Sequence, residues 1–176
     1  MNRLLTEGQL SQCIYTRVQL PAYDINTNGI MINLLVEAKP SHFTIINSYG
    51  RIAIALRKMF ERVISIMSTL KSSWEIFRDL EYNIQSKEEN FRVIDARSAG
   101  LPLCISLLNI FRQINGLEQV QNLVGTGLLR IDGSFNESSL EMQKKQAALQ
   151  ADDRTKFVNS ARCRHVFDLA NLMNCK

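Results

Sequence analysis

The sequence predicts a mixed α/β fold in which helices pack against a mixed sheet. Strand-like and helix-like segments alternate along the second half of the chain, which indicates layered α/β structure. Apolar residues recur at three-to-four spacing over residues 51–70, the pattern of a helix with one buried face. Residues 101–114 are apolar nearly all round, which is typical of a helix that is buried on most sides. We therefore expect a helix-covered sheet with one central helix.

The length and composition indicate an ordinary globular chain. The 176 residues are enough for one domain with a sizeable core, and we expect a single domain over residues 1–176. Residues 1–11 could form a flexible N-terminal extension. Hydrophobic residues make up 45% of the chain and charged residues 22%, which excludes a disordered protein.

The first half predicts strands followed by a long helix. Alternating apolar residues and β-branched residues predict strands at 12–20, 29–38 and 42–49. Pro21 and the polar residues 24–29 indicate the turn between the first two strands. In the helix predicted from Arg51, the charged residues fall on the side opposite the apolar face and are expected in solvent. They are Arg57, Lys58, Glu61 and Arg62.

The second half predicts shorter, alternating elements. Asn115 and Gly116 should end the helix at 101–114, as such residues commonly do. Gly125 and Gly127 within 122–133 indicate a strand with a bulge or a close backbone approach. The complete set is a strand at 74–84, a loop at 87–90, a strand at 91–95, the helix at 101–114, a strand at 122–133, a helix at 137–150, a strand at 156–160 and a helix at 165–173.

Charge and hydropathy limit the classes of partner. The net charge is +4 and basic residues form no block, so nucleic acid is not favoured as a partner. No segment reaches the roughly 18 consecutive apolar residues of a membrane span. The first residues lack the apolar core of a signal peptide, so we expect a cytoplasmic protein, although secretion without a visible signal stays open.

The cysteines and histidines predict no cofactor and no metal. Cys13, Cys104, Cys163 and Cys175 form no CxxC pair, which favours free thiols. Cys163 and His165 could be half of a metal site, but no second pair of ligands stands at suitable spacing. The simpler interpretation is a polar turn before the last helix.

Two motifs and the order of elements carry a resemblance to known families. Asp95-Ala-Arg-Ser98-Ala99-Gly100 resembles the Asp-Gly-Pro-Ser-Ala-Gly motif of the Lon protease proteolytic domain. Gly125-Thr-Gly-Leu-Leu-Arg-Ile-Asp-Gly-Ser-Phe135 resembles Thr-Gly-Glu-Ile-Ser-Leu-Arg-Gly in Lon and Gly-Glu-Leu-Ser-Leu-Asp-Gly-Ser-Leu in the ComM-type magnesium-chelatase-like proteins. The likeness spans most of residues 12–173. It implies the Lon proteolytic-domain fold, shared with the second domain of a small-subunit ribosomal protein.

The resemblance to Lon implies a catalytic Ser–Lys dyad. Ser98 would be the nucleophile, and Lys144 or Lys145 would be the general base. A neutral, buried lysine within hydrogen-bond reach could take the hydroxyl proton. The backbone N–H groups of Ala99 and Gly100, at a helix N-terminus, would form the oxyanion hole.

The residues themselves favour a simpler role for Ser98 and the lysines. Serine is a preferred helix N-cap, and a first-turn proline such as Pro102 suits a helix start. Lys144 and Lys145 would then lie on a solvated helix face. The glycine-rich turn that precedes Lon's lysine is absent, and Lys144 stands two residues further along than Lon's spacing.

The leading functional expectation is therefore a stand-alone pseudoenzyme. A Lon/ComM-like domain without catalysis would act by binding a protein partner or by self-association. No P-loop motif occurs, so the chain contains no ATPase motor of that type. The alternative is an ATP-independent Ser–Lys peptidase that uses Ser98 with Lys144 or Lys145.

Overall fold

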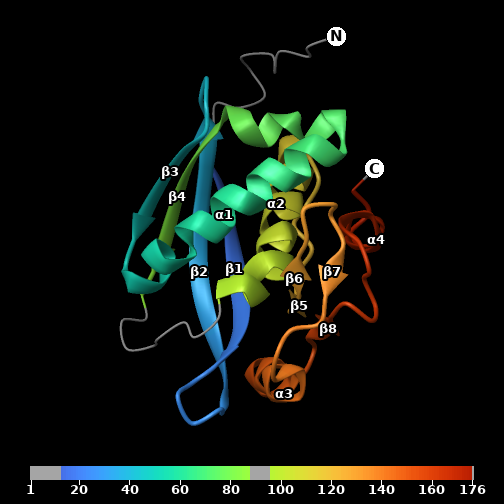
Figure 1. Ribbon diagram of the computed structural model, residues 1–176. Coiled ribbons are helices and arrows are strands. Elements are labelled where there is room, and N and C mark those ends of the chain that lie inside the picture. Colours follow the sequence, from blue (N-terminus) through green and yellow to red (C-terminus); the bar gives the residue numbers. More distant parts are fainter. Residues whose placement is uncertain (1–12, 88–95, 176) are drawn as a thin grey trace.

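The computed structural model describes residues 13–87 and 96–175. Its largest sheet has four strands in the order β1-β2-β4-β3. Helices α1, α2 and α4 lie on one face of this sheet, and α3 lies across its lower end (Figure 1). The strands are β1 (Ile14–Tyr23), β2 (Gly29–Pro40), β3 (Ile45–Tyr49) and β4 (Leu80–Ser86), and the helices are α1 (Arg51–Leu70), α2 (Gly100–Ile114), α3 (Glu141–Ala151) and α4 (Val166–Leu172).

Strands β1 and β2 form a long antiparallel hairpin. Ile14 pairs with Ala38 at one end and Tyr23 pairs with Gly29 at the other. Alternate side chains point into the core, and they are Val18, Leu20, Ile32, Leu34 and Val36. This alternation confirms both predicted strands, although each is longer than expected. Pro21 lies within β1 rather than after it, which an edge strand tolerates.

The predicted helix at 51–70 is confirmed with the same bounds, as α1. It connects β3 to β4, which run parallel, so α1 crosses over one face of the sheet. Its apolar face includes Leu56, Phe60 and Val63, all buried, and the four charged residues named above are exposed on the other side. The strand predicted at 42–49 is confirmed in part, as β3, which pairs with β4 and not with β2.

The strand predicted at 74–84 is wrong in its first half. Residues Ser72–Asp79 form a 3-10 helix, η1, and strand β4 begins at Leu80. Trp74 and Phe77 are both buried three residues apart, which matches the three-residue period of a 3-10 helix. The strand predicted at 91–95 and most of the loop at 87–90 lie outside the described residues.

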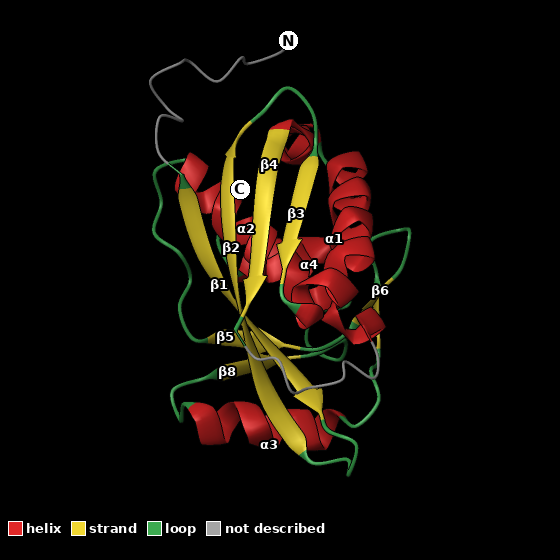
Figure 2. Ribbon diagram, turned by 90° about the vertical axis from the view of Figure 1, so that its left-hand side faces the viewer, coloured by secondary structure: helices red, strands yellow, loops and turns green. Residues whose placement is uncertain are grey.

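Helix α2 is the centre of the molecule. It begins one residue before the predicted 101–114, and every residue from Gly100 to Phe111 is buried. Helix α2 packs against β1, α1 and α4. In Figure 2 it lies behind the strands of the large sheet. Gly116, with a φ of 73°, adopts the left-handed backbone that glycine favours just past a helix end. The all-round apolar pattern is therefore confirmed as a central, buried helix.

The remaining strands are much shorter than the sequence suggests. The single strand predicted at 122–133 is two strands, β5 (Leu123–Gly125) and β6 (Leu128–Leu129). Strand β5 pairs in parallel with β8 (Lys156–Val158), and β6 pairs with β7 (Phe135–Asn136). Strand β7 ends at Asn136. The helix predicted at 137–150 starts later than expected, at Glu141. The helix predicted at 165–173 is confirmed as α4.

The fold is mixed α/β, with a mixed sheet and helices packed against it, as the sequence predicts. Its buried apolar side chains form one continuous cluster that reaches from Val18 in β1 to Cys175 near the C-terminus. No helix within residues 13–87 and 96–175 is both long enough and apolar enough to cross a membrane.

Candidate functional site

Ser98 lies at the start of the central helix, but not as its cap. It belongs to a short 3-10 helix, η2 (Ala96–Ala99), which leads directly into α2. The N-cap position of α2 is held by Ala99, with no side-chain capping bond. Ser98 is only 5% exposed. The predicted N-cap role is therefore wrong, because the turn before α2 is itself helical and shifts the serine one residue upstream of the cap.

The two adjacent lysines lie in opposite environments. Lys144 is fully buried on the inner face of α3, whereas Lys145 is exposed. The solvated face expected for both is confirmed for Lys145 and wrong for Lys144. Successive residues on a helix are turned by about 100°, so two neighbours can lie on different faces, as these two lysines do. The structure separates the two candidate bases.

The ammonium group of Lys144 lies among hydroxyl groups. Its Nζ is 3.5 Å from Thr126 Oγ1 and 3.4 Å from Ser138 Oγ. The two hydroxyls are 2.8 Å apart and hydrogen-bonded to each other. The Tyr23 ring lies beneath the ammonium, with its centre 5.4 Å from Nζ. Lys144, Thr126 and Ser138 are all buried, so they form an internal polar cluster, which we call the lysine cluster.

Neighbouring residues connect the lysine cluster to Ser98. Thr126, which contacts Lys144, is followed by Gly127 in the link between β5 and β6. The N–H of Gly127 donates to the carbonyl oxygen of Ser98 at 3.3 Å. The carbonyl of Gly127 accepts from the N–H of Leu101 at 3.2 Å. Ser98 and Lys144 thus flank the same two-residue segment, from η2 and α3 respectively.

Close packing fixes the position of α3. Gly29, at the end of the β1–β2 hairpin, touches the backbone carbonyl of Gln143, and a Cβ atom there would collide with it. Leu140, the residue before α3, adopts a left-handed backbone with φ of 54°. Glu141 accepts hydrogen bonds from the Ser138 N–H and from the Asn159 side chain. These contacts hold the first turn of α3, and Lys144 with it, against the hairpin.

Ala99 and Gly100, the predicted oxyanion donors, lie at the junction of η2 and α2. Both are buried. A Cβ atom on Gly100 would lie 2.8 Å from Leu129, so glycine permits the close approach of β6. Because η2 leads directly into α2, these two N–H groups lie within a continuous helical stretch and not at a free helix end. The predicted donors directly follow Ser98 in this stretch.

The site contains residues to which the sequence assigns no role. Thr126 lies within the motif that resembles Lon, but neither motif includes Ser138 or Tyr23. Tyr23 reaches Lys144 from the other half of the chain, so no local pattern predicts it. The Ser138 hydroxyl reaches Lys144 from the segment before α3, which turns at the left-handed Leu140.

The suggested half metal site has a structural role instead. The His165 ring accepts a hydrogen bond from the Phe167 N–H and caps α4. Its other nitrogen contacts the carbonyl of Asp132 at 2.8 Å. No group of three metal-ligating residues occurs in the described part of the chain.

Comparisons with known proteins leave the site to be judged on its geometry. No protein-family model matches the chain, and no curated protein matches it.

Proposed function

We propose that the chain is a Ser–Lys peptidase, in which Ser98 is the nucleophile and Lys144 the general base. The observation that carries this proposal is the complete burial of Lys144 beside Thr126, whose neighbour Gly127 bonds to Ser98. The resemblance of the Ser98 and Thr126 motifs to the Lon proteolytic domain supports the same assignment.

Burial suits Lys144 for proton transfer. Removal from water disfavours the charged form of a lysine, and a neutral amine can accept a proton from a serine hydroxyl. The hydroxyls of Thr126 and Ser138 give the amine fixed neighbours, which orient it. Lys145 is exposed and lacks this environment, so we assign the general base to Lys144 alone.

Charge develops beside the junction of η2 and α2 during acyl transfer. As the Ser98 oxygen attacks a peptide carbonyl, its proton passes to Lys144 and the carbonyl oxygen becomes negative. Backbone N–H groups of Ala99 and Gly100 would stabilise that oxygen. The protonated Lys144 then donates to the leaving amine, which gives an ester on Ser98. Attack by water, with Lys144 again accepting a proton, releases the acid and restores the serine.

Labelling with a serine-reactive probe tests the proposal. We expect a fluorophosphonate to modify Ser98, and the modification to disappear in Ser98→Ala. Lys144→Met keeps the side-chain length and removes the amine, so labelling should fall by at least about 100-fold, the usual scale of a lost general base. Lys145→Met is the matched control and should label at the original rate. Mass spectrometry of the labelled peptide identifies the modified residue.

The same experiment can overturn the proposal. Absence of labelling under conditions in which a Lon domain reacts would refute it, as would equal labelling of Lys144→Met and the unmodified chain. Modification of Ser138 instead of Ser98 would show that the nucleophile is Ser138, in the lysine cluster. Circular dichroism of each variant, compared with the parent chain, separates loss of chemistry from loss of folding.

The second candidate is a binding domain that lacks catalysis. The observation that favours it is that Ser98 is 5% exposed and Lys144 is 0% exposed, so a substrate reaches neither without some opening of the site. In this case Ser98 would support the packing of η2, and the chain would act through a protein partner or by self-association. Failure of labelling together with a specific complex that survives Ser98→Ala would establish this function.

A further inference from the structure

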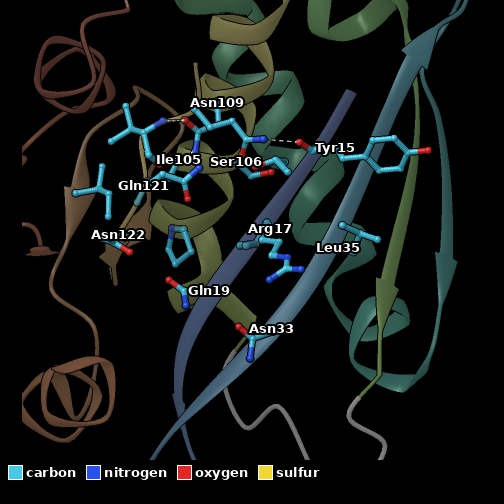
Figure 3. Close-up of a pocket in the computed structure, with 16 residues that line it drawn as sticks. Tyr15, Arg17, Gln19, Asn33, Leu35, Ile105, Ser106, Asn109, Gln121 and Asn122 are labelled. Carbon is cyan, nitrogen blue, oxygen red and sulfur yellow. Dashed lines mark hydrogen bonds between the residues drawn. The ribbon is translucent and has the colours of Figure 1, made fainter. Parts of the chain in front are cut away.

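A groove runs along the outer edge of β1, away from the lysine cluster. Its volume is about 610 Å³. Strand β1, together with Asn33 and Leu35 of β2, forms one wall, and α2 with the segment 119–123 forms the other (Figure 3). Side chains of Arg17 and Gln19 lie on the strand side, and Ser106 and Asn109 lie on the helix side. The groove is therefore bounded by a strand edge and by fixed secondary structure.

The strand at this groove has an unused edge. Among the described strands, β1 pairs only with β2 and is the first strand of the sheet. In an antiparallel pair, alternate residues direct their N–H and C=O groups away from the partner strand. The Tyr15 carbonyl accepts from the side chains of Gln113 and Gln119, so it points away from β2. Arg17 and Gln19 share this orientation and present their backbone groups to the groove.

Pro21 agrees with this assignment. It is the next residue of the outward set, and it has no N–H to offer. Proline in a sheet is found mainly where its nitrogen faces away from the neighbouring strand. At this edge the Tyr15 carbonyl is already hydrogen-bonded and Pro21 has no N–H. The two residues between them whose backbone groups could pair with a further strand are Arg17 and Gln19.

Two buried hydroxyls lie near this groove. Thr16 Oγ1 and Ser106 Oγ have no hydrogen-bond partner among the described residues, although both residues line the groove. Both oxygen atoms are closed to solvent, so they do not identify a ligand.

The opposite wall is held rigidly. The Asn109 side chain accepts from the Val120 N–H at 2.8 Å and donates to the Val120 carbonyl at 3.4 Å. Arg112 donates to the carbonyl of Glu118 at 2.7 Å. A preformed wall lowers the entropic cost of binding. The groove is therefore ready to take a ligand without rearrangement of this segment.

We propose that this groove binds an extended polypeptide segment of a protein partner, which adds to β1 as a further strand. Backbone groups of the segment pair with Arg17 and Gln19, as in other cases of strand addition. Arg17 is the one charged side chain among the described residues that line the groove, so the segment carries an acidic residue opposite it. This binding is separate from the chemistry at Ser98 and does not depend on it.

A displayed library of random twelve-residue peptides tests the proposal, with the Ser98→Ala chain as bait so that no peptide is cleaved. We expect selected peptides to share an acidic position and to contain no proline in the paired stretch. Gln19→Pro removes the outward N–H at a position that, like Pro21, does not bond to β2. It should weaken binding of a selected synthetic peptide by about tenfold.

Matched variants separate the backbone from the side chains. Gln19→Ala keeps the N–H and should bind within about twofold of the parent chain, while Arg17→Glu should weaken binding by about tenfold or more. Circular dichroism confirms that each variant is folded. A library without binders, or equal binding by Gln19→Pro and Gln19→Ala, would overturn the proposal. Dimers of the chain that Gln19→Pro abolishes would also overturn it, because the occupant would then be a second copy.

Discussion

The four-stranded sheet with α1 and the region from Leu123 to Leu172 are built in different ways. The first region has strands of 10 and 12 residues and a helix of 20 residues. The second region has strands of only two or three residues, joined by tight turns. Yet the second region supplies all three residues of the lysine cluster, Thr126, Ser138 and Lys144. The first region supplies only the Tyr23 ring that lies against it. Long regular elements provide the framework, whereas Thr126 and Ser138 lie in irregular segments that adjoin short strands and Lys144 lies on α3.

The difference teaches where the stability and the function reside. The apolar cluster is continuous and includes residues of both regions, such as Phe60 and Leu169. The short strands cannot be stable alone, because two or three ladder bonds do not offset the entropy of ordering the chain. We therefore expect the second region to fold only together with the first. Substitutions of the polar side chains in the second region should have little effect on the folding of the first.

The largest expected effect comes from the core of the first region. Phe60 is fully buried and packs edge-to-face on Tyr82, with ring centres 5.0 Å apart. Phe60→Ala should lower the free energy of unfolding by about 3–5 kcal/mol. Because the core is shared, both regions should unfold in one transition, measured by urea titration with circular dichroism. Lys58→Ala, exposed on the same helix, should change stability by less than about 0.5 kcal/mol. Two separate transitions would show that the regions are independent domains.

An intermediate effect is expected where the two regions touch. In Gly29→Ala the new methyl group collides with the Gln143 carbonyl, so α3 must move away from the hairpin. We expect a loss of about 1–3 kcal/mol in stability, together with slower labelling of Ser98 as Lys144 moves. Gly116→Ala is the control, since its backbone is left-handed but its Cβ meets no atom within 4 Å. That control should lose about 1–2 kcal/mol and leave labelling unchanged. Unchanged labelling in Gly29→Ala would mean that α3 does not set the position of the lysine.

The smallest effect is a difference in thiol reactivity between the regions. A hydrogen bond with Glu37 is the main cause that raises the pKa of the exposed Cys13, so its labelling should need a pH above the usual thiol range. Burial raises the pKa of Cys104 in α2, of Cys163 in the second region and of Cys175 after α4. A raised pKa leaves less thiolate at a given pH, which slows alkylation.

Peptide mapping after alkylation at several pH values measures these rates. We expect Cys13 to react first, Cys163 and Cys175 next, and Cys104 last, because Cys104 lies in the fully buried centre of α2. Glu37→Gln should accelerate Cys13 and leave the other three unchanged. Equal rates for the three buried thiols would contradict this order, since they would mean that the molecule opens only as a whole.

The sequence predicts the first region better than the second. Residues 51–70 form a helix with the predicted bounds because one face is consistently apolar, and α2 is found because it is apolar nearly all round. Residues 74–79 were predicted as strand because a 3-10 helix of eight residues leaves little periodicity, with Trp74 and Phe77 as its marker. The segment 122–133 alternates like one strand, but Gly125 and Gly127 allow close contact with Leu101 and divide it.

The candidate site was predicted in part. Ser98 and Lys144 were named from local motifs, and the structure distinguishes Lys144 from Lys145 by burial. Ser138 and Tyr23 could not be predicted, because their approach to Lys144 depends on a left-handed residue and on the end of a distant hairpin. Such contacts are set by tertiary packing, which no local pattern records.

The hydrogen bonds at Tyr15 also bear on how the chain is made. The carbonyl of Tyr15 is covered by Gln119, 104 residues later in the chain, and by Gln113. A ribosome delivers Tyr15 long before either glutamine, so the edge of β1 emerges uncovered. It stays uncovered until α2 has left the exit tunnel. During that interval the edge of the nascent strand can pair with a wrong strand. The edge at Tyr15 can be covered only after Gln113 and Gln119 have been synthesised.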